Sequence, residues 1–229
     1  MSNFYYDQNG LIVQKDLDGG DTASREGLYW FSQSLYAKGS PGLTTEQRNE
    51  FNRVLNLLQT NPGVFIRNPI KYNDPKDFSR DQTVPLILAM GAMRERDYLK
   101  LLFKKQTNNF FRYQNNDVGF FQDLNYYIRA FHNVFFYPLL FLGDTCLLVE
   151  SIIRCIQGRD LNNVGDDINH TAVLLQAQYT LSTPISFLAR KIYKWFRPKG
   201  IQYAWDWYFR PETGANDFND VYRNLIEMM

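Results

Sequence analysis

Apolar residues recur at helical spacing along most of this chain, in segments that begin at capping residues and end at glycine or proline. Leu28, Phe31 and Leu35 share one such stripe, which begins at about Thr22 and ends at the glycine–proline break over 39–42. A spacing of three or four residues aligns side chains on one face of a helix. The pattern therefore predicts a mainly α-helical chain.

The same reading places further helices along the chain. They are expected over residues 44–60, from 79 or 81 to about 90, and over 97–105, 123–136, 134–156, 168–181, 183–195 and 217–229. Segment 134–156 is the most apolar, but its charged residues indicate a buried core helix rather than a membrane span. Strand is expected only as a small hairpin near 1–15 or 110–120. We expect an array of helical hairpins or a bundle.

Length and composition limit the function classes. The 229 residues, 45% hydrophobic and 21% charged, fit one globular domain over 1–229. A formal charge of +1 gives no global field that attracts nucleic acid or an anionic membrane, so neither is an expected partner. The aromatic share of 16% is unusual and favours a wide core, a sugar-binding groove or a large interface.

The first motif with chemical potential is Asp18-Gly19-Gly20-Asp21-Thr22-Ala23-Ser24-Arg25-Glu26-Gly27. Its double glycine allows a tight turn, and the carboxylates and Arg25 at a helix start can bind a polar ligand. The structural alternative is a capped helix in which Arg25 pairs with Asp21 or Asp18. Gly27 inside the helix costs about 1 kcal/mol relative to alanine, so its lack of a side chain is expected to serve a purpose.

The second motif, Asp77-Phe78-Ser79-Arg80-Asp81-Gln82, repeats this plan after a long polar loop. Both motifs place an arginine and an acid in the first turn of a helix, and we expect them to face each other. The alternative is that Arg80 forms a buried salt bridge between helices and Gln82 acts as a cap.

The third motif surrounds Trp205, Trp207 and Arg210. Aromatic rings beside charged groups suit saccharide binding, because the rings can stack on the apolar face of a sugar. The structural alternative is a hydrophobic contact that closes the domain.

Other catalytic or metal-binding patterns are weak. His132 and His170 are the only histidines and are too isolated in sequence to indicate a metal site, while Cys146 and Cys155 are expected to be buried free thiols. No cofactor-binding motif is recognised. The N-terminus does not have the pattern of a secretory signal, so the cytoplasm or an assembled virion are the expected locations.

The paired carboxylates, arginines and aromatics on loops of a helical array resemble those of α/α-toroid carbohydrate-active enzymes. The resemblance covers about a tenth of the chain, and 229 residues are few for six hairpins, so it implies an incomplete toroid or a plain bundle. The Asp-Gly-Gly-Asp and Ser-Arg-Asp-Gln strings are also similar to ones in uncharacterised helical phage and environmental proteins.

Two functions follow as hypotheses. In the first, a carbohydrate-active domain uses Asp18, Asp21 and Asp81 as acid and base groups on a saccharide ligand. The ligand would be bound by the remaining residues of the three motifs, namely Arg25, Glu26, Arg80, Gln82, Trp205, Trp207 and Arg210. In the second, the chain is a non-enzymatic structural or adaptor protein with protein partners in an assembly, and its Asp/Arg motifs are internal salt bridges.

Overall fold

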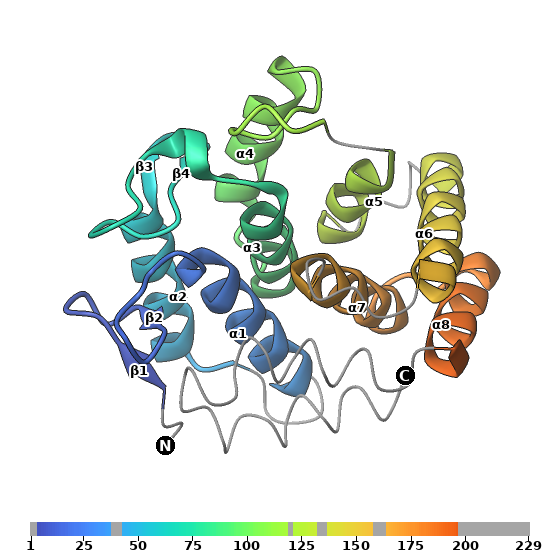
Figure 1. Cartoon of the computed structure of the whole chain (residues 1–229), viewed down its shortest axis with the longest axis horizontal. Coiled ribbons are helices and arrows are strands. Elements are labelled where there is room, and N and C mark those ends of the chain that lie inside the picture. Colours follow the sequence, from blue (N-terminus) through green and yellow to red (C-terminus); the bar gives the residue numbers. More distant parts are fainter. Residues whose placement is uncertain (1–3, 38–42, 119–120, 132–136, 158–163, 197–229) are drawn as a thin grey trace.

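A computed structural model describes residues 4–37, 43–118, 121–131, 137–157 and 164–196 (Figure 1). Within these ranges the chain is mainly helical, which confirms the predicted fold class. The eight α-helices are α1 (Thr22–Ala37), α2 (Thr45–Leu58), α3 (Arg80–Met93), α4 (Arg96–Asn108), α5 (Phe121–Ala130), α6 (Tyr137–Gln157), α7 (Val164–Tyr179) and α8 (Pro184–Phe196).

Two small antiparallel hairpins accompany the helices. β1 (Tyr5–Tyr6) pairs with β2 (Ile12–Val13), as expected for the N-terminal region. β3 (Gln59–Asn61) pairs with β4 (Val64–Phe65), and this second hairpin was not predicted. It replaces the last residues of the expected helix over 44–60. Gly63 makes its turn with a φ of 74°, in the left-handed region that favours glycine.

Local sequence signals account for several helix ends. The hydroxyl of Thr44 accepts from the main-chain N–H of Gln47, and the Gln47 side chain accepts from the N–H of Thr44, a complete capping box at the start of α2. Arg94 adopts left-handed geometry at the end of α3. α5 ends at Ala130, before the predicted end at 136, and the predicted helix over 217–229 lies outside the described residues.

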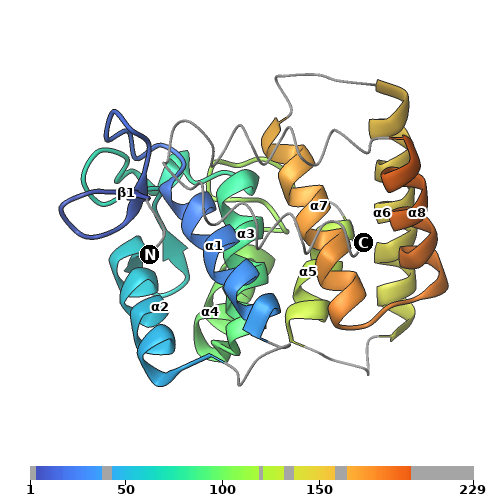
Figure 2. The ribbon, with the colours of Figure 1, turned by 90° about the horizontal axis from the view of Figure 1, so that it is seen from below.

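α3 lies at the centre of the molecule, with nearly all of its residues buried (Figures 1 and 2). α1 runs beside it and α4, α5 and α7 also contact it, while α6 and α8 pair with each other at one end. A helix that is covered on all sides must be apolar all round, and the run Val84 to Met90 meets that requirement. The central position of α3 therefore follows from its uniform hydrophobicity.

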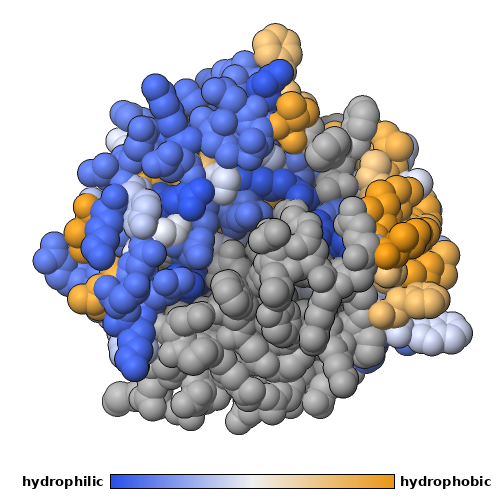
Figure 3. Space-filling model, viewed as in Figure 1, coloured by the Kyte–Doolittle hydropathy of each residue, from blue (hydrophilic) through white to orange (hydrophobic). Residues whose placement is uncertain are grey.

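α6 differs from the buried core helix predicted for 134–156. Its inner face carries buried Leu140 and Leu147, but Leu142, Val149 and Ile156 on the outer face are exposed. Phe187 and Leu188 on α8 are exposed as well, and Figure 3 shows an orange, hydrophobic area over α6 and α8. The prediction is correct for one face of the helix and wrong for the other, because apolar residues were read as buried wherever they occurred.

Candidate functional site

The two predicted Asp/Arg helix starts lie against each other. The main-chain N–H of Ser24 on α1 donates to Oε1 of Gln82 on α3 at 3.0 Å, and Nε2 of Gln82 donates to Oδ1 of Asp21 at 3.2 Å. The side chain of Gln82 is buried and so is Ser24. One amide side chain thus satisfies a free N–H in the first turn of α1 and joins it to the start of α3.

A proline explains the next contact between these helices. α3 begins at Arg80, so Pro85 lies in its second turn. Having no N–H, Pro85 leaves the carbonyl of Asp81 without its intrahelical donor. The hydroxyl of Ser24 donates to that carbonyl at 2.9 Å. α1 therefore supplies the hydrogen bond that Pro85 removes from α3.

Gly27 allows the close approach that this contact needs. A Cβ atom on Gly27 would lie 2.6 Å from the carbonyl carbon of Pro85 and 2.8 Å from the nitrogen of Leu86. These are main-chain atoms of α3 and cannot rotate away. The predicted need for a residue without a side chain at this position is confirmed.

The predicted catalytic carboxylates lie at the rim of this junction. The Asp21 side chain is 34% exposed and lies 3.8 Å from Nη2 of Arg25, whose own side chain is 1% exposed. Asp81 is half-buried, and its Oδ1 accepts from Nδ2 of Asn169 on α7 at 3.2 Å. Asp18 accepts from the N–H of Gly20 at 3.1 Å and is also half-buried. These side chains are engaged with neighbouring protein groups.

Glu26 points into the core rather than toward the junction. Its two oxygens accept from the N–H of Ile12 at 2.8 Å and from the indole N–H of Trp30 at 3.0 Å. Burial raises the pKa of Glu26 to about 7, although both hydrogen bonds act in the opposite direction. In this position Glu26 joins the N-terminal hairpin to α1.

Arg80 extends from the junction into a buried charge network. Its guanidinium lies 3.4 Å from Oδ1 of Asp123, 3.0 Å from the hydroxyl of Tyr126 and 3.9 Å from Oε1 of Glu150. Burial by itself would lower the pKa of Arg80, but these facing groups raise it above its usual value. Arg154 also pairs with Glu150, at 2.9 Å. This arrangement is the buried interhelical salt bridge considered for Arg80, with partners from α5 and α6.

His170 lies beside this network, between Ser151 and Glu150. The three side chains follow the serine, histidine, acid order of a hydrolase triad. Its Nε2 is 2.8 Å from Oγ of Ser151, and its Nδ1 is 3.6 Å from Oε2 of Glu150. Ser151 is fully buried, and its hydroxyl has two possible acceptors for its single hydrogen, the carbonyl of Leu147 at 3.0 Å and Nε2 of His170. A nucleophile must be reached by its substrate, and a fully buried hydroxyl is not. The geometry indicates a packing role for Ser151.

Glu150 itself is held ionised by its neighbours. Burial alone would raise the pKa of this carboxyl, but His170, Arg80 and Arg154 together hold it well below its usual range. In the sequence, Glu150 is one of the charged residues within the apolar segment 134–156. A buried carboxylate needs a cation beside it, so a glutamate in an apolar helix could have indicated a buried ion pair from the sequence alone.

A second buried network joins α5, α6 and α8. Oδ1 of Asp144 accepts from Nη2 of Arg129 and, at 2.8 Å, from Nδ2 of Asn125. Oδ2 of Asp144 accepts from the hydroxyl of Thr183 at 2.6 Å, and Thr183 directly precedes α8. The side chains of Arg129 and Asp144 are fully buried. Desolvation lowers the pKa of Arg129, against the favourable effect of Asp144.

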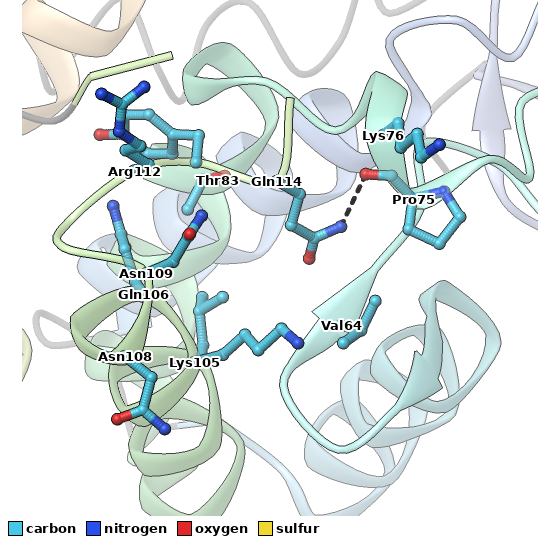
Figure 4. Close-up of a pocket in the computed structure, with 12 residues that line it drawn as sticks. Val64, Pro75, Lys76, Thr83, Lys105, Gln106, Asn108, Asn109, Arg112 and Gln114 are labelled. Carbon is cyan, nitrogen blue, oxygen red and sulfur yellow. Dashed lines mark hydrogen bonds between the residues drawn. The ribbon is translucent and has the colours of Figure 1, made fainter. Parts of the chain in front are cut away.

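A pocket of about 410 Å³ lies away from the helix-start junction (Figure 4). It is bounded by α4, by the 3₁₀ helix η1 (Pro75–Asp77) and by the turn over 109–114. Lys105 extends from α4 toward Val64 on the opposite wall, and Tyr113 also lines the space. None of the predicted site residues that lie within the described ranges lines this pocket, and no signal in the sequence had connected its walls.

The remaining predicted groups can be placed only in part. Trp205, Trp207, Arg210 and His132 lie outside the described residues. Cys146 and Cys155 are free thiols, but both are half-buried rather than buried. Within the described ranges, no three His, Cys, Asp or Glu side chains gather as a metal site would require. No helix in the same ranges is long and apolar enough to cross a membrane.

Comparison with known proteins gives no match, because no family model, curated protein sequence or solved structure is significantly similar to this chain. The resemblance to α/α-toroid enzymes therefore stays a prediction.

Proposed function

We propose that this chain is a structural assembly protein that associates with a second copy of itself through the outer face of α6, flanked by α8. The observation that carries the proposal is an uncharged, exposed, apolar seam along α6. We define this seam as Leu142, Thr145, Val149, Ile152 and Ile156.

The spacing of the seam suits helix pairing. Its five residues are separated by three, four, three and four positions, and all five are exposed. Alternating steps of three and four are the a and d positions of a coiled coil, whose side chains interlock with those of a facing helix. Ile156 is 79% exposed, far more than expected for an isoleucine with no further partner.

Charge makes a second copy the favoured partner. The three charged residues of α6, Asp144, Glu150 and Arg154, all point inward and are 12% exposed or less. Two seams can therefore meet about a two-fold axis without like charges in contact. The exposed Lys191 on α8 lies 5.4 Å from the ring of Phe187 and would remain at the polar rim of such an interface.

The internal pairing of the Asp/Arg motifs supports the same function. Gln82 and Arg25 are buried, Asp21 lies near Arg25, and Arg80 lies in a network with Asp123. Groups engaged in this way stabilise helix packing and are less available to a substrate. Internal pairing of this kind is what we expect if the chain is a non-enzymatic structural or adaptor protein.

The test is the molar mass of the full chain in solution. Sedimentation at rising protein concentration is expected to show a dimer in the native protein and a monomer in Ile152→Lys, because a charge at the centre of the seam would be buried without a partner. Leu101→Lys is the matched control, since Leu101 on α4 is 38% exposed and Ile152 is 40% exposed. The control is expected to dimerise like the native chain.

Two outcomes overturn the proposal. One is a native chain that is monomeric into the hundreds of micromolar, as it would be if residues 197–229 or a different protein cover the seam. The other is a dimer that Ile152→Lys leaves intact while circular dichroism shows the variant to be folded.

We also propose, as a second candidate, saccharide binding at the rim of the helix-start junction. It is favoured by the position of the half-buried Asp18, Asp21 and Asp81 around the two adjoining helix starts, with Tyr72 beside Gly20. Two carboxyl groups near each other can supply an acid and a base for glycoside hydrolysis.

A panel of oligosaccharides tests this second candidate. Binding or hydrolysis is expected to be lost in Asp21→Asn and Asp81→Asn and kept in Asp97→Asn, whose carboxylate is 93% exposed on α4. If the native chain neither binds nor cleaves any member of a broad panel, the candidate is abandoned.

A further inference from the structure

We infer that the pocket between α4, η1 and the 109–114 turn binds a small organic phosphate, such as a sugar phosphate or a nucleoside monophosphate. Its volume of about 410 Å³ is within the usual range for small-molecule sites. The inference does not depend on the proposed assembly, because the pocket and the α6 seam share no residue.

The charge of the walls points to an anion. Lys76 from η1, Lys105 from α4 and Arg112 from the turn all line the pocket. None of the described residues lining it is an aspartate or a glutamate. Three cations from separate elements suit a phosphate group, which carries about 1.5 to 2 negative charges and three acceptor oxygens. Arginine adds a planar pair of donors matched to phosphate oxygens.

Gln106 lines the pocket and carries one buried polar atom without a partner among the described residues. Its Oε1 accepts from the hydroxyl of Tyr127, which fixes the amide so that Nε2 is a donor. Nε2 is buried and has no hydrogen-bond partner among the described residues, although the side chain lines the pocket. A buried donor without a partner costs about 1–3 kcal/mol. Nε2 is closed off from the pocket space, so a ligand oxygen would bond to it only after the Gln106 side chain moves.

The opposite wall of the pocket is rigid. Oε1 of Gln114 accepts from the N–H of Phe65 at 2.8 Å, and its Nε2 donates to the carbonyl of Phe65 at 2.7 Å. Nε2 also donates to the carbonyl of Pro75 at 2.8 Å, the bond that is dashed in Figure 4. These bonds tie the 109–114 turn to β4 and η1. A site whose walls are fixed in advance binds with a smaller loss of entropy.

The backbone between two of the lining residues is strained. Phe110 and Phe111 have φ values of 52° and 58°, in the left-handed region that is costly for residues with side chains. Strain of this kind is often kept where it positions functional groups. Here it sets the positions of Asn109 and Arg112 at either end of the pair, and both line the pocket.

Calorimetric titration of the full chain tests the inference, with inorganic phosphate, glucose 6-phosphate, AMP and uncharged glucose as probes. We expect glucose 6-phosphate or AMP to bind saturably and more tightly than inorganic phosphate, and glucose not to bind. Lys105→Gln and Arg112→Gln are each expected to weaken that binding at least tenfold. Lys104→Gln, an exposed lysine on α4 that does not line the pocket, is the matched control.

Gln106→Glu provides a second variant. It keeps the acceptor for Tyr127 but replaces the free donor with a negative charge, so it is expected to abolish binding. The inference is overturned if neither organic phosphate binds, if inorganic phosphate or glucose binds as tightly as both, or if Lys104→Gln loses as much affinity as Lys105→Gln. Circular dichroism of each variant shows whether a loss of binding reflects unfolding.

Discussion

The hydroxyl of Ser24 on α1 donates to the main-chain carbonyl of Asp81 on α3, the acceptor that Pro85 leaves without an amide hydrogen. A proline inside a helix normally exposes such a carbonyl to solvent or distorts the helix. In this protein the neighbouring helix supplies the donor. The contact joins the two helix starts that the sequence had singled out.

Ser24→Ala is expected to lower the free energy of unfolding by about 1–3 kcal/mol, because the carbonyl of Asp81 would be left buried without a donor. In a Pro85→Ala background the new N–H of residue 85 can donate to that carbonyl. The cost of Ser24→Ala should then shrink. Denaturant unfolding of all four proteins in this double-mutant cycle measures the coupling. An equal cost in both backgrounds would show that the hydroxyl does not replace the missing amide.

Gly27→Ala is expected to destabilise the protein by about 1–3 kcal/mol, since the added methyl group would meet the backbone of α3. Alanine is the better helix former, so propensity alone predicts the opposite sign. Gly20→Ala is the control, because its added Cβ would have its nearest neighbour at an ordinary 3.5 Å. Thermal and denaturant unfolding distinguish the two substitutions, and a stabilised Gly27→Ala variant would contradict the close approach.

Glu26 is expected to make stability depend on pH between about 4.5 and 7. Its pKa is about 7 in the folded protein and about 4.5 in the unfolded chain. Over that interval the unfolded chain releases a proton that the folded state keeps, so the free energy of unfolding falls as pH rises. The total fall is about 3 kcal/mol.

Glu26→Gln removes this titration, and its free energy of unfolding should change less between pH 4.5 and 7. The comparison is the difference between native and variant proteins across a pH series, which cancels the other titrating groups. Parallel curves for the two proteins would show that burial does not shift the Glu26 carboxyl.

Asp144→Asn is expected to cost about 3–5 kcal/mol, because it leaves the buried Arg129 guanidinium without its counter-charge. Asp97→Asn on α4 breaks an ion pair whose carboxylate is 93% exposed, and a change below about 1 kcal/mol is expected there. Urea unfolding of both variants makes the comparison. Similar costs for the two would mean that the Arg129–Asp144 pair contributes no more than a surface contact.

The helices were largely predictable because their signals are local. Hydrophobic spacing and the capping threonine at residue 44 place α2 correctly at its start. The β3–β4 hairpin was missed, because its short strands continue directly from α2 without a break in polarity that sequence reasoning could detect. Strand pairing depends on a partner segment, and a pair of two or three residues has little pattern of its own.

The two Asp/Arg motifs show how far sequence reasoning reaches toward a site. Their shared plan led to the expectation that they face each other, and Gln82 contacts both Ser24 and Asp21. The partners of Arg80 were not predicted, since Asp123 and Glu150 are distant in sequence and belong to helices whose rotation about their axes is set by packing. The cationic pocket was missed for the same reason.

The sequence by itself determined the helical class, the need for a small residue at position 27 and the helix-start motifs, because these depend on interactions within a few residues of the chain. Only the tertiary structure decided what those motifs do. In the folded chain, Ser24 donates to the carbonyl of Asp81, which Pro85 leaves without a donor, and Glu26 is buried against the N-terminal hairpin. The tertiary structure also left the α6 seam exposed and brought Lys76, Lys105 and Arg112 around one pocket. The physical reason is that burial and charge pairing depend on which distant segments meet, and short-range spacing carries no information about those meetings.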